Sequence, residues 1–347
     1  MQKACVIVVM LFLVSFGFPV AYADRGMIPV VPEVSVYEPG QKAIVAWNGR
    51  EEILILSTDV SASAETLVLE ILPLPSKPVV EAASFQSFQR IQEMIWEEGV
   101  NFGKFSTTYN ARSGSVEVLF HEQIGAHNIT VVKASDSSAL VDWTNSFLSA
   151  SGVDQEVTLR NFESVIDDYM GRGFRYYVLD LITFAPEERS IDPIRYKFDS
   201  STLYYPLLIT SPVGGDGEIT LFTLTGEKLT GGYQPFRLAS YIVSGGQSQP
   251  IQFVLSRGDL SRIDLRIGEL LPEGAWLSVL KYEGSLSYLE RDLMMAESAF
   301  NPSVGSPQTV VVEMPYGVLA LFFVLGALSV SLGVGIAIFV FHLSRKK

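Results

Sequence analysis

Cysteine is almost absent from this sequence, since Cys5 is the only one among 347 residues. Cys5 lies in an amino-terminal segment that we expect to be removed, so the mature chain would contain no cysteine. This excludes disulfide bonds, thiol nucleophiles and cysteine metal sites, and the fold must depend on its hydrophobic core. The remaining length of about 280 residues suits one large domain or two ordinary ones.

Basic residues are also few: 25 lysines and arginines stand against 38 aspartates and glutamates, for a formal charge of -13. Four of the cations, Lys3, Arg345, Lys346 and Lys347, lie in the terminal segments, and without them the charge is about -17. This balance argues against a nucleic-acid partner or an anionic lipid surface. It predicts a solvated acidic exterior, with diffuse cation binding as the alternative.

Histidine and sequence motifs for catalysis are scarce as well. Of three histidines in the chain, only His121 and His127 lie between the terminal segments, and we expect both at the surface or at a strand edge. No other histidine or cysteine lies between the terminal segments to complete a zinc or acid-base site with them. The sequence holds no Gly-x-Ser-x-Gly elbow and no glycine-rich phosphate loop. It therefore predicts no metal, no cofactor and no assignable catalytic residue.

The amino terminus has the three parts of a secretory signal. Lys3 supplies positive charge, Val6 to Phe18 form an apolar run, and Ala21-Tyr22-Ala23 provides small residues before a cleavage point. We expect residues 1–23 to be a signal peptide cut between Ala23 and Asp24. An uncleaved anchor is the alternative, but the apolar run is short for a span of about 20 residues.

The carboxy terminus predicts a membrane helix over residues 316–343. Val318 to Phe341 carry no charge, and a helix of that length reaches about 36 Å, enough for a core of about 30 Å. The basic tail 344–347 favours a cytoplasmic end. We therefore expect a single-pass cell-membrane protein with its folded part outside and a juxtamembrane stalk over 299–315.

The predicted span has a row of small residues and a second interpretation. Ser329, Gly333 and Ala337 recur every four residues, a spacing that lets two helix backbones pack closely and favours self-association. Small residues are also common in membrane helices for other reasons. Alternatively the span and its basic end form a sorting tail that is processed, although Met314-Pro315-Tyr316-Gly317 matches no sorting motif.

The segment between the terminal regions predicts an α+β fold rich in mixed or antiparallel strands, with three to four helices. An α+β part covers 24–186 and a β-rich part covers 187–298. Asn48-Gly49 between two apolar runs predicts a type I′ hairpin, and the apolar run from 174 to 184 predicts a central strand buried on both faces. Helices are expected after three capping residues, namely Ser84, Ser135 and Thr158.

Further strands are expected throughout the chain. The apolar runs that predict them are 66–72, 116–120, 129–132, 203–209, 219–224, 251–255 and 276–282. Gly214-Gly215-Asp216-Gly217 predicts a hairpin turn, and its closely spaced oxygens with Glu218 fall short of a calcium loop. No internal repeat is present.

Three stretches resemble a known family. They are Ile71-Leu72-Pro73-Leu74-Pro75-Ser76-Lys77-Pro78, the run from Ile124 to Trp143 (IGAHNITVVKASDSSALVDW), and Tyr176-Tyr177-Val178-Leu179-Asp180-Leu181. Over roughly residues 24–210 the chain resembles the exported domain-of-unknown-function family 2330. The resemblance implies no activity. Its members begin the mature chain with Cys-Gly-Gly, where this chain has Asp24-Arg25-Gly26, so any role of that cysteine is absent here.

Three carboxylates and two short motifs remain as candidate sites. Asp167, Asp168 and Asp180 are carboxylates that a hydrolase could use, although Asp180 is expected to face water or pair with an arginine. Asn128-Ile129-Thr130 is an N-glycosylation acceptor sequence inside a predicted strand. Arg257-Gly258-Asp259 matches an adhesion tripeptide that is common by chance.

Three function classes follow from these observations. The favoured one is a non-enzymatic binding or structural protein of the cell surface, with a surface protein, a polymer or a second copy as its partner. The alternatives are an envelope-associated hydrolase that uses carboxylates, and a carbohydrate-binding module that uses exposed aromatic residues such as Tyr204 or Tyr205.

Overall fold

The structure of the protein is a computed structural model. It describes residues 28–29, 36–62, 66–98, 114–115, 121–124, 126–153, 159–184, 189–190, 193–242, 247–296 and 299–300. All of these belong to one compact unit, Met1–Val304. The predicted signal peptide, the strand 116–120, Thr158, residues 301–315 of the stalk, the span and the basic tail lie outside the described residues. Within the described part, no helix has the length and apolarity to cross a bilayer.

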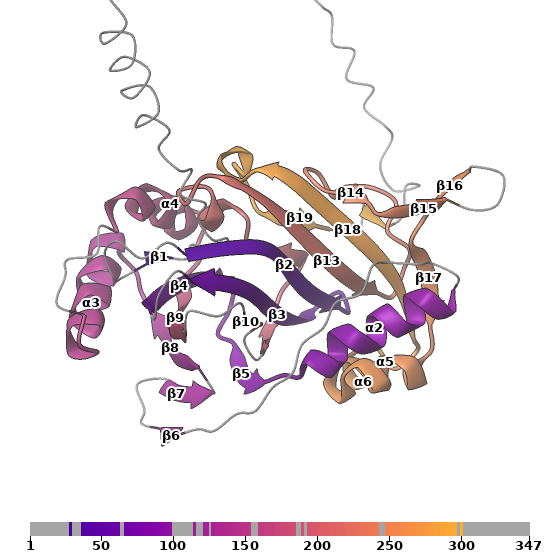
Figure 1. Ribbon diagram of the computed structural model, residues 1–347, viewed down its shortest axis with the longest axis horizontal. Coiled ribbons are helices and arrows are strands. Elements are labelled where there is room, and N and C mark those ends of the chain that lie inside the picture. The colour runs from indigo at the N-terminus through magenta and orange to yellow at the C-terminus, as the bar shows by residue number, and fades with distance from the viewer. Residues whose placement is uncertain are drawn as a thin grey trace, which may run out of the picture. The chain divides into compact units, whose positions relative to one another are not determined.

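A nine-stranded sheet forms the centre of this unit (Figure 1). Its strands are β2 (Val36–Trp47), β3 (Glu51–Ala62), β5 (Val79–Ala82), β10 (Arg189–Ser190), β11 (Ile194–Asp199), β13 (Asp216–Thr225), β14 (Arg237–Leu238), β17 (Gln252–Leu255) and β18 (Ala275–Ser285). The main order is β14-β18-β13-β2-β3-β11-β5. β2 and β13 run parallel, whereas the other pairs are antiparallel. The predicted parts 24–186 and 187–298 thus contribute strands to the same sheet.

A second sheet has six strands in the order β1-β4-β9-β8-β7-β6. These are β1 (Ile28–Pro29), β4 (Thr66–Leu74), β9 (Tyr176–Phe184), β8 (His127–Lys133), β7 (His121–Ile124) and β6 (Gly114–Ser115). β9 lies between β4 and β8, which confirms the prediction of a central strand. Two short pairs complete the β structure: β12 (Leu203–Tyr205) with β19 (Leu293–Met295), and β15 (Ser240–Ile242) with β16 (Ser248–Pro250).

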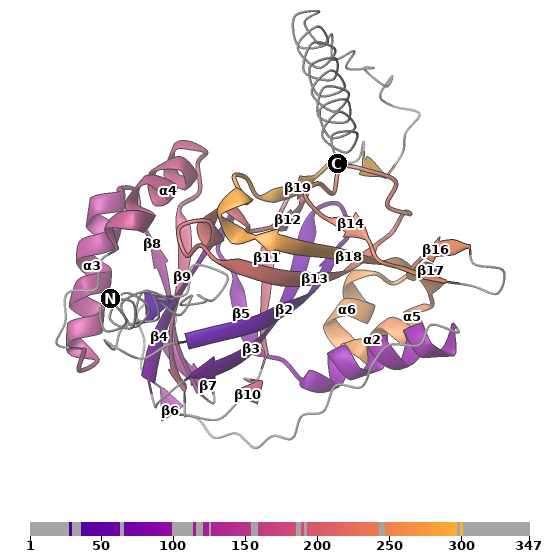
Figure 2. The same ribbon diagram turned by 45° about the horizontal axis from the view of Figure 1, so that its top comes forward.

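Five α-helices are described, in two groups. They are α2 (Phe85–Glu97), α3 (Ser137–Ala150), α4 (Arg160–Gly171), α5 (Arg257–Ile263) and α6 (Leu265–Leu270), with 3-10 turns η1 (Leu208–Thr210) and η2 (Leu286–Tyr288). In both views α2, α5 and α6 lie together beside the nine-stranded sheet, and α3 and α4 lie beside the six-stranded sheet (Figures 1 and 2). The α+β, strand-rich class is confirmed.

Alternation along β2 and β3 divides the core into two layers. Ile44 and Ile55 belong to one cluster with Ile91 of α2, whereas Val45 and Leu54 belong to the cluster on the other side of the sheet. Successive side chains of a strand point to opposite faces, so near-continuous hydrophobicity in both strands allows both faces to be buried. Burial of each such side chain stabilises the fold by about 1.5–3 kcal/mol.

The predicted hairpin is confirmed, but its turn lies one residue later than expected. Trp47 pairs with Glu52, and Asn48 donates its backbone N–H to the Glu51 carbonyl. The central residues are therefore Gly49 and Arg50, with Gly49 at a φ of 94°. The Asn48 side chain accepts from the backbone N–H of Arg50 and of Glu51, which explains why asparagine precedes the turn instead of occupying it.

The predicted cap is confirmed for α2 but not for α3, nor for α4, which begins after Leu159 without a side-chain cap. Ser84 caps α2 as predicted, its side chain accepting from the Gln86 N–H. The cap of α3 is Asp136 and not Ser135, because the Asp136 carboxylate accepts from the Ala139 N–H. α5 and α6 were not predicted. Asp259 of the Arg257-Gly258-Asp259 tripeptide closes a capping box with Ser256, so a helix start accounts for it.

The turn at Gly214-Gly215-Asp216-Gly217 does not belong to a hairpin. It follows η1 and leads into β13, whose neighbours are β18 and β2. Gly214 and Gly215 both have positive φ, and the Gly215 carbonyl accepts from the Leu286 N–H. A glycine pair allows this backbone path, and the partner strand comes about 60 residues later in the chain, which local sequence patterns do not indicate.

Candidate functional site

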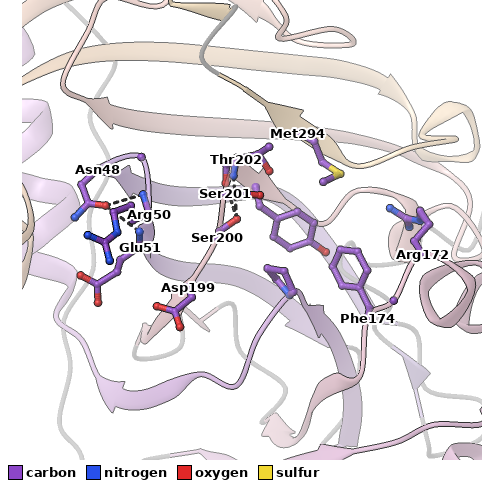
Figure 3. A pocket seen from close by; sticks show the side chains of 14 residues that line it. Asn48, Arg50, Glu51, Arg172, Phe174, Asp199, Ser200, Ser201, Thr202 and Met294 are labelled. Atoms are coloured by element: carbon purple, nitrogen blue, oxygen red, sulfur yellow. Dashed lines mark hydrogen bonds between the residues drawn. The ribbon is translucent and has the colours of Figure 1, made fainter.

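A cavity of about 930 Å³ opens between the β2–β3 turn and the end of α4 (Figure 3). Three segments and two single residues line it. They are Asn48, Gly49, Arg50 and Glu51; Arg172, Gly173 and Phe174; Asp199, Ser200, Ser201, Thr202 and Tyr204; and Pro75 and Met294. A volume of this size lies at the upper end of the range typical of small-molecule sites.

Hydrogen bonds join two walls of the cavity, the β2–β3 turn 48–51 and the loop 199–202. The Ser200 N–H donates to the Arg50 carbonyl (2.9 Å), and the Trp47 indole N–H donates to the Ser200 carbonyl (3.0 Å). The Ser200 hydroxyl also donates to the Thr202 carbonyl (2.6 Å). The turn that carries Arg50 and the loop 199–202 are therefore fixed relative to each other before any ligand arrives.

A buried carboxyl group, that of Glu52, is hydrogen-bonded to a residue of the cavity lining. Glu52 is fully buried, and its Oε2 accepts from the Tyr204 backbone N–H at 2.7 Å. Burial raises the pKa of Glu52 well above its usual value, although the Tyr204 hydrogen bond lowers it. Because a protonated acid has no net charge, Glu52 can remain inside the core next to the cavity.

Tyr204 and Tyr205 are buried, so the prediction of exposed aromatic residues is wrong. Their exposed fractions are 0% and 1%. The Tyr204 hydroxyl donates to the Pro73 carbonyl (2.9 Å) and that of Tyr205 to Gln41 Oε1 (2.8 Å). The short strand β12, which contains both tyrosines, pairs with β19 near the end of the folded unit. The sequence around the tyrosines gives no indication of this distant partner.

Asp292 joins the elements at the α4 end of the cavity. Its Oδ1 accepts from the Tyr169 hydroxyl (2.6 Å) and from the backbone N–H groups of Leu207 (2.9 Å) and Leu208 (3.0 Å). Its Oδ2 accepts from the Arg172 guanidinium (2.8 Å). Burial, followed by the charge of Asp292, raises the pKa of Tyr169, which therefore stays a hydroxyl donor. Sequence reasoning missed Asp292, which has no local motif around it.

The His127 and Asp180 side chains form a buried pair in the six-stranded sheet. Asp180 is 2% exposed, and its Oδ2 lies 2.5 Å from His127 Nδ1. Glu70 is directly opposite Asp180, and Ile129 opposite its other side, so Glu70, Asp180 and His127 share one face of the sheet. The predictions that His127 lies at the surface and that Asp180 faces water or an arginine are both wrong.

A family model described as "Uncharacterized protein conserved in bacteria (DUF2330)" matches residues 20–232. The chain belongs to this family. The match confirms the resemblance seen over residues 24–210. In this DUF2330 member the matched region includes Arg50, Arg172 and Asp199 of the cavity, whereas Asp292 and Met294 follow it.

Two other comparisons add nothing on activity. The crystal structure of baculovirus P35 is similar at a TM-score of 0.39 and 10% identity, over 76% of the DUF2330 chain and 97% of the baculovirus chain. Similarity this low supports no argument about function. No curated protein matches the sequence.

The structure does not bring the three predicted carboxylates of this DUF2330 protein together. Asp167 and Asp168 are exposed on α4, where Asp168 pairs with Arg172 (2.7 Å). Asp180 is enclosed in β9 with His127. The three acids do not line the 930 Å³ cavity. Within the described ranges, no group of three or more histidine, cysteine, aspartate and glutamate side chains is placed to hold a metal.

The remaining predicted positions of the DUF2330 protein lie in strands or outside the described residues. Asn128 lies in β8 and is half-buried. His121 lies in β7 and pairs with Thr130 of β8. The positions Ala23, Asp24, Ser329, Gly333 and Ala337 lie outside the described residues.

Proposed function

We propose that this protein is a single-pass, membrane-anchored extracytoplasmic protein that binds a ligand in the 930 Å³ cavity and performs no reaction there. The cavity carries the proposal, because it is a preformed concave site built on the ends of rigid strands. Its two walls are tied by the Ser200–Arg50 and Trp47–Ser200 hydrogen bonds, so binding requires little reorganisation of the backbone.

The terminal segments support the location. An export signal over 1–23, cleaved between Ala23 and Asp24, would deliver the chain across the membrane. A span over 316–343 would retain it, with the basic residues of 344–347 on the cytoplasmic side. Ala299 and Phe300, at the start of the predicted stalk, pack in the core of the folded unit. The rest of the stalk, residues 301–315, would separate this unit from the bilayer, and Ser329, Gly333 and Ala337 would allow two spans to associate.

The chemistry of the cavity favours binding over hydrolysis. Of the two carboxylates that line it, Glu51 is paired with Lys197 (2.8 Å) and Asp199 is exposed, so neither is enclosed as the proton-donating acid of a hydrolase is. The one His–Asp pair described, His127 with Asp180, is buried in the other sheet and is out of reach of a ligand in the cavity. Arg172 is held by Asp168 and Asp292, which suits a fixed binding group better than a group that must move protons.

Two measurements test the proposal. The first maps topology: the folded part, detected with an antibody, and a carboxy-terminal tag on the full-length protein are probed with an added protease on intact cells, after signal cleavage is confirmed by mass. The proposal expects a mature chain that starts at Asp24, a folded part that is accessible from outside and a protected carboxy-terminal tag. An inaccessible folded part would refute it.

The second measurement blocks the cavity. Ser201→Trp places a large side chain on its exposed wall, and Ser248→Trp makes the same change on β16, away from the cavity. Full-length protein is cross-linked in its native membrane and its bound material is analysed. We expect Ser201→Trp to lose what wild type and Ser248→Trp retain. Equal retention by all three would show that the cavity is not the binding site.

A further inference from the structure

The geometry points to a neutral oligosaccharide as the ligand of the 930 Å³ cavity. This inference rests on the proposed function and gives the chemical class of what is bound. The cavity surface combines an uncompensated donor, an uncompensated acceptor, two hydroxyl groups and a small apolar patch, in a space large enough for more than one sugar ring.

Formal charge on the cavity surface cancels. Two arginines, Arg50 and Arg172, and two carboxylates, Glu51 and Asp199, line it. Glu51 is neutralised further by Lys197 (2.8 Å), and Arg172 by Asp168 and Asp292. A phosphorylated or carboxylated ligand would need a net cationic surface, and a polyamine would need a net anionic one. Neither is present, so the charge balance favours an uncharged ligand.

The polar groups that are left over suit vicinal hydroxyl groups. Arg50 and Asp199 are both exposed, and neither has an ion pair within the described part of the chain. A guanidinium donates only and a carboxylate accepts only, whereas a sugar hydroxyl does both. One hydroxyl can therefore accept from Arg50 while its neighbour donates to Asp199, and the side chains of Ser201 and Thr202 lie on the same loop as Asp199 (Figure 3).

Apolar contact lies at the opposite end of the cavity. Met294 is 49% exposed, although it is an apolar residue. It lies in the same region as Phe174, whose ring packs under the Arg172 guanidinium at 5.2 Å (Figure 3). The carbon-bound hydrogens on one side of a pyranose ring form an apolar face, and a flexible methionine adapts to such faces. Arg50 and Asp199 at one end and the exposed Met294, beside Arg172, at the other offer the two kinds of surface that a sugar chain presents.

The test is a binding measurement on the full-length protein in detergent micelles. The probes are maltotetraose, cellotetraose and chitotetraose as neutral chains, and tetragalacturonate as an anionic chain, each titrated by calorimetry up to about 10 mM. We expect at least one neutral tetrasaccharide to bind, and the anionic chain to bind at least tenfold more weakly or not at all. The dissociation constant should change less than about twofold when the ionic strength of the buffer is raised, because no charge pairing is involved.

Matched variants assign the site. Arg50→Met combined with Asp199→Ala removes both charges and the hydrogen-bonding groups that carry them, and at least a tenfold loss of affinity is expected. The control applies the matching changes, Arg237→Met and Glu283→Ala, to an exposed ion pair between β14 and β18 outside the cavity. Circular dichroism confirms that both proteins are folded, and the control should bind within about twofold of wild type.

Three results would overturn the inference: no neutral tetrasaccharide binds, tetragalacturonate binds most tightly, or the cavity variant keeps wild-type affinity. These outcomes are separable from failure of the proposed function. A protein with the expected topology, whose bound material is lost on Ser201→Trp but which takes no neutral sugar, would retain the proposed function and lose only the ligand class.

Discussion

Replacing Asp292 with asparagine tests whether a single buried carboxylate holds the α4 end of the cavity in place. Asparagine keeps the shape and one acceptor oxygen, so Tyr169, Leu207 and Leu208 retain a partner. Its amide NH₂ then faces the Arg172 guanidinium, which donates at this point, so a donor meets a donor. The variant isolates the loss of charge from the loss of volume.

The same arginine provides the magnitude and the control. The Asp292 side chain is 0% exposed, and Asp168, the second partner of Arg172, is 50% exposed. Loss of a charge-assisted buried hydrogen bond costs about 1.5–3 kcal/mol, and weaker bonds from the three other donors bring the expected cost of Asp292→Asn to about 2–4 kcal/mol. Asp168→Asn breaks an exposed pair and should cost less than about 1 kcal/mol.

Urea unfolding of the full-length protein, followed by far-ultraviolet circular dichroism and tryptophan fluorescence, measures both free energies. The reasoning requires a clear gap between the two variants. If Asp292→Asn and Asp168→Asn cost the same within about 0.5 kcal/mol, the buried carboxylate does not hold these elements together. A truncation to alanine, Asp292→Ala, should cost at least as much as the asparagine variant, because it leaves four donors without an acceptor.

Three further predictions concern other buried or strained positions. Because its folded-state pKa is raised, Glu52 contributes stability that is fully present below the unfolded pKa of about 4.3 and is lost as pH rises through the folded value. Glutamine does not ionise, so urea titrations should give Glu52→Gln a higher free energy of unfolding than wild type between pH 5 and 8, and an equal one near pH 4. Asp180→Ala should cost about 3–5 kcal/mol by leaving His127 buried without this carboxylate, and the double variant with His127→Leu should cost less than the sum of the single changes in a double-mutant cycle. Gly274→Ala should cost at least about 1–2 kcal/mol in thermal unfolding, because φ is +92° and a Cβ would lie 2.6 Å from the Leu255 carbonyl oxygen, whereas Gly226→Ala, with no atom within 4 Å, should be nearly neutral.

Local signals in the sequence predicted local structure well. The hairpin around Asn48, the cap at Ser84 and the buried strand β9 all depend on residues close together in the chain. α5 and α6 were missed because seven and six residues hold less than two turns each, too few for a helical pattern to stand out. Gly268 within α6 also suggests a loop, yet it is required where α6 approaches Ser261, since a Cβ there would lie 2.1 Å from the Ser261 hydroxyl oxygen.

Most of the site depends on partners far apart in the sequence. Asp180 was expected to face water or pair with an arginine, because its partner His127 lies 53 residues away and no spacing rule connects the two. Tyr205 was considered exposed because β19 begins about 90 residues later. The cavity itself joins a turn, a helix end and a loop that the sequence separates by roughly 120 and 25 residues. Only Arg50 and Asp199 give an indication of it, as charged residues next to turns.

The parallel pairing of β2 with β13 has a consequence for how the chain reaches its fold. β3 follows β2 after three residues, but β13 follows only after about 170, and such distant pairings form slowly. β13 in turn needs β18, which begins at Ala275, beyond the family match that ends at residue 232. A chain cut at that boundary would present β13 as a long unpaired edge and invite aggregation. A soluble fragment should therefore extend past Asp292. During synthesis, four of the nine strands of the central sheet, β13, β14, β17 and β18, are made only with the last third of the folded unit.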